Sequence, residues 1–169
     1  RDLHTAYRRQ RQMCIRDSDY PDSTIDAPTD NGYYNSLTNI TGTASDSTSG
    51  VDHVNITIYN STDGTYWTGS AWQSGVAWLN TNGTGSWYND SGLPTWVSGK
   101  TYVVNSTAVD VAGNVESVPD SSSFTYDTVA PSDLTYNTVE DQWYTSNPTL
   151  DIDFSDGIAL ETVDYKVDS

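Results

Sequence analysis

The tryptophans are the residues whose chemical nature and spacing most suggest a binding function. Indole rings stack on sugars because the axial C–H groups of a sugar meet the negative face of the π-system. The cluster therefore predicts a carbohydrate site, with Trp72 and Trp96 as contacts because polar or turn residues flank both. The alternative, which composition favours, is a core-building role, since phenylalanine occurs only twice. Five of the six tryptophans form this cluster: Trp67, Trp72, Trp78, Trp87 and Trp96.

Carboxylate and amide oxygens suggest a second kind of chemistry. Asp46 precedes one expected strand, and Asp110 and Asn114 follow another, at what should be the same end of a β-sandwich. Oxygen ligands in irregular geometry suit calcium, the one cofactor that the sequence leaves open. Asp127 and Asp156 form a second candidate pair, at the junction between two units. The competing interpretation, which we favour, is that residues 110–114 form a tight turn in which the aspartate bonds to the backbone.

Sequons of the N-x-S/T type suggest attached glycans on an extracellular protein. Three of them, at Asn39, Asn55 and Asn105, fall opposite the apolar positions of expected strands, where a glycan could project. Plain polar outer faces explain the same pattern equally well. The six candidates are Asn39, Asn55, Asn60, Asn82, Asn89 and Asn105.

Motifs for catalysis are missing from the sequence. His53 is the only histidine beyond residue 18, and no thiol accompanies it there. No G-x-S-x-G, phosphate-binding loop or H-E-x-x-H stretch occurs. The sequence therefore predicts that this chain is not an enzyme.

The elements that must position these residues are strands. Apolar and polar residues alternate with period two, as in Val54-Asn55-Ile56-Thr57-Ile58, and turn residues separate the runs. We expect an all-β, immunoglobulin-like antiparallel β-sandwich. Tyr102 should form a tyrosine corner, with its hydroxyl bonded to an upstream carbonyl. The expected strands are 23–27, 37–45, 51–60, 65–79 (a short hairpin), 85–89, 100–110 and 121–127.

The same pattern begins twice. Ile40 to Asp46, followed by an alternating run, returns roughly 110 residues later as Leu150 to Asp156 and its own run. We therefore expect a complete domain at 22–128 and a truncated second repeat at 129–169. Residues 1–21 should be unstructured. Positions 12–18 look like a translated sequencing adapter from a metagenomic assembly, so this leader is expected to be non-native.

Several pieces carry a family resemblance, the strongest being Ala108-Val109-Asp110-Val111-Ala112-Gly113-Asn114-Val115-Glu116. The chain resembles the immunoglobulin-like repeats of large bacterial and archaeal surface proteins and adhesins. That resemblance implies a β-sandwich repeat in an extracellular or cell-surface stalk or adhesive fibre. Its partners would be neighbouring repeats of the same chain and, where it adheres, surface glycans or proteins. The other matching pieces are 23–25, 33–37, 42–46, 64–72, 78–79, 87, 99–102 and the 127–131 junction.

Charge excludes some partners. Residues 1–18 hold five of the seven basic residues, so the rest of the chain has two lysines against 21 carboxylates. Such a surface repels nucleic acids and anionic lipids, and no stretch is apolar enough for membrane insertion. We expect a stalk spacer or adhesion module. The alternatives are a carbohydrate-binding module using the Trp67–Trp96 cluster, or an accessory domain of a secreted hydrolase.

Overall fold

The computed structural model describes residues 19–131, 135–136 and 152–153, and every regular element among them is a strand. Alternating apolar residues of these strands line a common interior, which is why the chain folds into layers rather than helices. The strands of the first unit are β1 (Asp22–Ala27), β2 (Gly32–Tyr34), β3 (Ile40–Ser45), β4 (Val51–Asn60), β5 (Thr65–Trp67), β6 (Trp72–Gln73), β7 (Leu79–Asn80), β8 (Ser86–Asn89), β9 (Lys100–Asp110) and β10 (Asp120–Tyr126).

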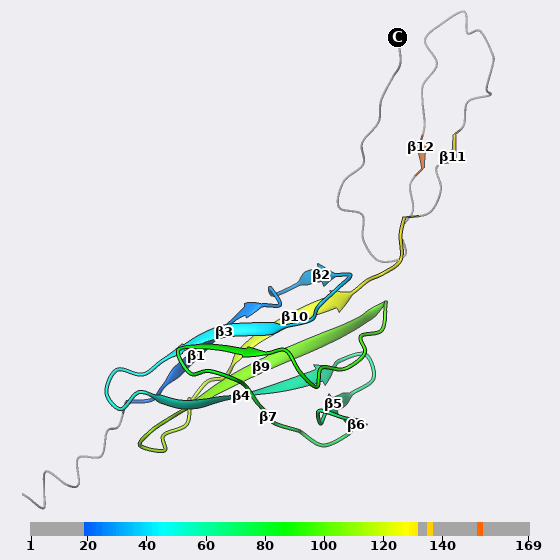
Figure 1. Cartoon of the computed structure of the whole chain (residues 1–169). Coiled ribbons are helices and arrows are strands. Elements are labelled where there is room, and N and C mark those ends of the chain that lie inside the picture. The colour runs from blue at the N-terminus through cyan, green and yellow to red at the C-terminus, as the bar shows by residue number, and fades with distance from the viewer. Residues whose placement is uncertain (1–18, 132–134, 137–151, 154–169) are drawn as a thin grey trace, which may run out of the picture.

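Two sheets face each other (Figure 1). The smaller has the order β1-β3-β8, and the larger has the order β2-β10-β9-β4-β5-β6, with β7 also paired to β4. All pairs are antiparallel except β2 with β10, which run parallel. The expected all-β, immunoglobulin-like sandwich is confirmed. The chain enters at one end, beside the start of β1, and leaves at the other, beyond β10 (Figure 1).

The second unit is described at two strands. β11 (Thr135–Tyr136) pairs antiparallel with β12 (Ile152–Asp153). The remainder of the predicted second repeat, including Asp156, lies outside the described residues, as do residues 1–18.

Most strands lie where the alternation predicts them, and the differences have physical reasons. The strand expected to begin at residue 37 begins at Ile40. The Leu37 carbonyl instead accepts the Trp96 indole N–H at 2.8 Å, so it is not available for strand pairing. The expected 65–79 hairpin is β5 and β6, followed by β7. β2 is not predicted by the sequence. It has three residues, and its partner β10 lies far along the chain.

The core lies between the sheets and includes Ile40, Val54, Ile56, Ile58, Trp87, Tyr102, Val104 and Phe124. Trp87 occupies the space above Gly42, its partner across β3 and β8, and donates its indole N–H to the Thr43 carbonyl at 3.0 Å. A side chain at Gly42 would collide with this ring. The pair fixes how closely β3 and β8 approach.

Tyr102 does form a corner, but not with the expected carbonyl. Its hydroxyl accepts the backbone N–H of Val97 at 3.0 Å. The prediction of an upstream carbonyl partner is therefore wrong, because the loop presents a donor at this point. Burial raises the pKa of Tyr102, and the Val97 N–H offsets this only in part.

Carboxylates cover the free edge of β1. Glu116 accepts the Ser23 backbone N–H at 3.0 Å and the Ser23 hydroxyl at 2.6 Å, and it also accepts the Ala108 N–H at 2.8 Å. Asp120 accepts the Ile25 N–H at 2.7 Å. Because Ala108 belongs to β9, Glu116 joins the two sheets.

Candidate functional site

The tryptophans of the predicted cluster have separate roles. Trp87 is fully buried, and Trp67 donates its indole N–H to the Gly92 carbonyl at 2.6 Å. Trp72 lies against Tyr102 and Trp67, at ring-centroid distances of 6.0 and 5.2 Å. Trp78 is 52% exposed, although the sequence did not single it out as the exposed member. Trp87 therefore cannot contribute to a sugar-stacking face, whereas ring contacts through Tyr102 link Trp67, Trp72 and Trp96.

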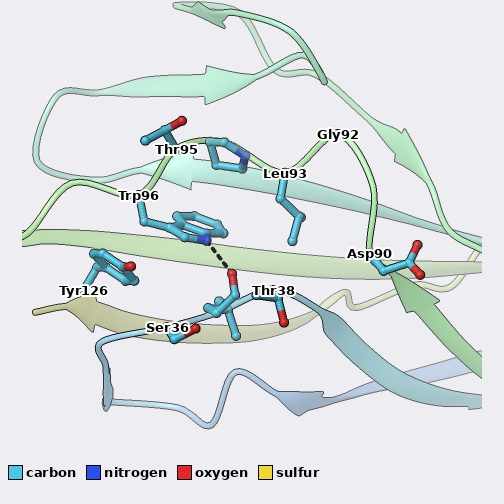
Figure 2. Close-up of a pocket in the computed structure, with 10 residues that line it drawn as sticks. Ser36, Thr38, Asp90, Gly92, Leu93, Thr95, Trp96 and Tyr126 are labelled. Carbon is cyan, nitrogen blue, oxygen red and sulfur yellow. Dashed lines mark hydrogen bonds between the residues drawn. The ribbon is translucent and has the colours of Figure 1, made fainter. Parts of the chain in front are cut away.

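A surface hollow of about 480 Å³ surrounds Trp96 (Figure 2). One wall is the segment that connects β2 to β3, the other is the connection from β8 to β9, and Tyr126 closes it at the end of β10. We call this feature the Trp96 hollow. Its lining residues are Ser36, Leu37, Thr38, Asp90, Gly92, Leu93, Pro94, Thr95, Trp96 and Tyr126.

The packing of Trp96 holds the hollow in shape. Its ring meets Tyr102 and Phe124 edge to face, at centroid distances of 4.9 and 5.2 Å, and it tilts by 35° against Tyr126. The indole bond to the Leu37 carbonyl joins the two walls. Trp96 thus packs against the core and also lines the hollow, whereas the sequence presented these two roles as alternatives.

The loops that carry Asp46 and Asp110 lie together, as expected for one end of the sandwich, with the Val111 N–H donated to the Gly50 carbonyl at 2.9 Å. One oxygen of Asp46 accepts the backbone N–H groups of Thr48, Ser49 and Gly50 at 2.7–3.0 Å. Burial opposes ionisation of Asp46, but these N–H groups outweigh it and hold its pKa below the ordinary value.

Asp110 stabilises its own turn, residues 110–114, by the same kind of hydrogen bonding. Its carboxylate accepts the Asn114 backbone N–H at 2.6 Å and the Asn114 side-chain amide at 2.7 Å. Burial raises the pKa of Asp110, but hydrogen bonds from Asn114, Ser49 and Gly113 together outweigh this effect, so that the pKa is lowered. This arrangement is the tight turn that we favoured over a calcium loop.

No group of three or more histidine, cysteine, aspartate or glutamate side chains suited to a metal occurs in the described part of the chain. Asp46 uses one oxygen on the N–H groups of its own loop, and Asp110 accepts from Asn114. The other oxygen of Asp46 is buried and has no hydrogen-bond partner in the described part of the chain. Calcium at this end remains a prediction. Asp127 lies at the opposite end of the sandwich, and its predicted partner Asp156 is outside the described residues.

Asp127 holds the outgoing chain instead. Its carboxylate accepts the Val129 N–H at 2.9 Å, and its own N–H is donated to the Tyr34 carbonyl at 2.8 Å. The Ser98 hydroxyl accepts a hydrogen bond from the Thr128 N–H at 2.9 Å and donates one to the Asp127 carboxylate at 3.4 Å. Residues 127–129 are thereby tied to the body of the domain.

The sequons differ in accessibility. Asn82 is exposed, and Asn39, Asn55 and Asn105 are half-buried. Asn60 and Asn89 are 3% and 6% exposed, and both side chains bond within the fold. These two cannot carry a glycan in the folded domain, because inward-facing positions of β4 and β8 leave no room for one.

His53, the lone histidine considered for chemistry, bonds Asp52 at 2.8 Å near the surface. Within the described residues, no helix is long and apolar enough to cross a membrane.

Comparison with known proteins gives only distant structural likenesses. No family model matches the chain, and no curated protein does. CopC from Methylosinus trichosporium OB3b is similar at a TM-score of 0.41 and 18% identity, over 64% of this chain and 93% of that one. An engineered protein is similar at a TM-score of 0.40 and 21% identity, over 64% of this chain. The matched part is 20% of the engineered chain. Neither likeness assigns a function.

Proposed function

We propose that this chain is a length of immunoglobulin-like repeats from an extracellular or cell-surface protein, where it acts as a stalk spacer or adhesion module. One observation carries the proposal: β2, near the start of the domain, pairs in parallel with its last strand, β10. Tension that pulls the two ends of the chain apart acts along both strands in opposite directions. Their hydrogen bonds are then loaded together rather than one after another.

The placement of the ends supports the same role. The chain enters at one end of the sandwich and leaves at the other (Figure 1), so each domain adds its length to a stalk. β1 is also loaded along its length against β3, and Glu116 and Asp120 hold its other edge. Asp127 and Ser98 fix the direction in which the chain leaves.

The short pairing beyond the linker supports repetition. β11 and β12 stand roughly 110 residues after β1 and β3, and they pair antiparallel with the same register to within one residue. A second sandwich that begins in the same way would place its first strands there. Neighbouring repeats of the same chain would then be its permanent partners.

Single-molecule pulling tests the spacer role. The full chain, with Cys14→Ser to leave no native thiol, is held by its two ends, and its unfolding should release about 35–40 nm of contour in one event. In a second geometry, Tyr20→Cys and Ser47→Cys provide the handles, so that β1 and β3 open from one end, bond by bond. We expect the end-to-end geometry to need several times more force. Equal forces would contradict the proposal.

A further inference from the structure

The Trp96 hollow combines apolar walls with polar groups at its rim. Trp96, Tyr126, Leu93 and Pro94 provide the apolar surface. Hydroxyl groups come from Ser36, Thr38 and Thr95, and a carboxylate comes from Asp90. The lining of the hollow is divided about equally between polar and apolar surface, and its volume of about 480 Å³ falls within the roughly 300–1,000 Å³ of small-molecule sites.

The polar groups of the rim have no structural task in the fold. Within the part of the chain that the structure describes, no hydrogen bond engages the side chains of Thr38, Asp90 or Thr95. Other aspartates at this end differ: Asp63 pairs with Lys100, and Asp127 holds the outgoing chain. Asp90 and its neighbouring hydroxyls are therefore open to a ligand.

The chemistry of the walls selects the kind of ligand. The lining contains no lysine, arginine or histidine, so it offers an anion no opposite charge, and Asp90 repels one. A purely apolar ligand would strip water from three hydroxyls and a carboxylate without replacing those bonds. A neutral sugar residue satisfies both sides, because its C–H face meets the aromatic rings while its hydroxyls bond to the rim.

We propose that the Trp96 hollow binds one neutral sugar residue of a glycan, with Asp90 and Thr38 as hydrogen-bonding partners and Trp96 and Tyr126 as the apolar platform. This inference deepens the adhesive half of the proposed function. It requires that the domain fold, but not that the repeats bear tension, so the pulling experiment and the binding experiment can fail separately.

The test is a titration of the ¹⁵N-labelled full chain with maltotriose, cellotriose and mannotriose, followed by NMR. At least one trisaccharide should shift the Trp96 indole N–H and the backbone amides of Thr38 and Asp90 in a saturable way. The Trp96 N–H is a suitable reporter because its bond to Leu37 spans the two walls.

Variants identify the site without disturbing the core. Asp90→Asn and Thr38→Val should each weaken binding about five- to tenfold, because the first replaces a charged acceptor with a neutral amide and the second removes a hydroxyl, both at exposed positions. Asp22→Asn and Thr84→Val change equally exposed residues elsewhere and should leave the affinity unchanged. Thermal melting of all four should match the parent chain.

Three results would overturn the proposal. The first is the absence of a saturable shift with all three sugars. The second is binding that Asp90→Asn and Thr38→Val both leave intact. The third is saturation of the same resonances by choline chloride and not by sugars, which would make the hollow a cation site built on aromatic faces.

Discussion

Gly42 shows how a single residue sets the distance between neighbouring strands. A Cβ atom at this position would lie 2.0 Å from the Thr24 carbonyl oxygen and 2.2 Å from the Trp87 ring. Real Cβ atoms do not approach other atoms so closely, and the neighbours are backbone and a buried ring that cannot withdraw. The missing side chain is what allows the Trp87 ring to pack directly against β3 at Gly42.

We predict that Gly42→Ala lowers the free energy of unfolding by about 2–3 kcal/mol, measured by urea denaturation, because the methyl group overfills this part of the core. Gly85→Ala is the matched control. No atom lies within 4 Å of its added Cβ, so its effect should stay within about 0.5 kcal/mol. Equal effects of the two substitutions would show that Trp87 does not depend on Gly42.

Single residues were also the hardest feature to predict from the sequence. The capping role of Asp46 and Asp110 follows from their turn sequences, since aspartate commonly bonds the backbone of a following turn. No local sequence feature predicted the role of Glu116. Its partners are Ser23 and Ala108, and only the folded sheets bring those residues to it.

At the scale of elements, β1 is secured on both of its edges. One edge pairs with β3, and the other meets carboxylates instead of another strand. An uncovered strand edge invites pairing with other chains, and charged side chains are a common protection. Here the carboxylates accept the edge N–H groups as well, so they also bind the first strand to the opposite sheet.

We predict that Glu116→Gln lowers the free energy of unfolding by about 2 kcal/mol. The carboxylate accepts three hydrogen bonds through its two oxygens, whereas an amide must turn its NH₂ group toward one of those donors. Asp120→Asn is the matched control, since its remaining oxygen can keep the single bond from Ile25. Chemical denaturation checks both. A loss for Asp120→Asn as large as that for Glu116→Gln would count against this account.

Alternation predicted the long strands well because each of them has one buried face. It failed at β2 and at the hollow for one reason. Both are formed by segments that local sequence leaves irregular, and contacts far along the chain give them their shape. β2 is ordered by β10, and the walls of the Trp96 hollow are joined by the bond from Trp96 to Leu37. A single sequence does not reveal such pairings.

At the scale of the whole molecule, acid should unfold the domain. The pKa values of Asp30, Asp46 and Asp110 lie below the ordinary value of 3.8 in the folded state. For Asp30 the main cause is the backbone N–H of Ser123. A lowered folded-state pKa stabilises the protein above the unfolded-state pKa, and this stabilisation is lost as the pH falls through the folded-state value.

We predict a melting temperature that falls steadily below about pH 4, measured by circular dichroism. The Asp46→Asn, Asp110→Asn double variant should show a shallower fall. Relief of repulsion in so acidic a chain acts in the opposite direction. The double variant Asp22→Asn, Asp26→Asn therefore serves as the control, because it removes the same charge at exposed sites. Identical pH profiles for the two double variants would refute the role of the capped turns.

The burial of Asn60 and Asn89 bears on where this chain can be made. Secretory routes that attach oligosaccharides to nascent polypeptides act before a domain has closed, and they would modify both sequons while these are still accessible. A bulky sugar tree on either residue would then block the closure of β4 or β8. Yeast or animal-cell expression should consequently yield misfolded product, which Asn60→Gln with Asn89→Gln would relieve in part, whereas a bacterial cytoplasm imposes no such obstacle.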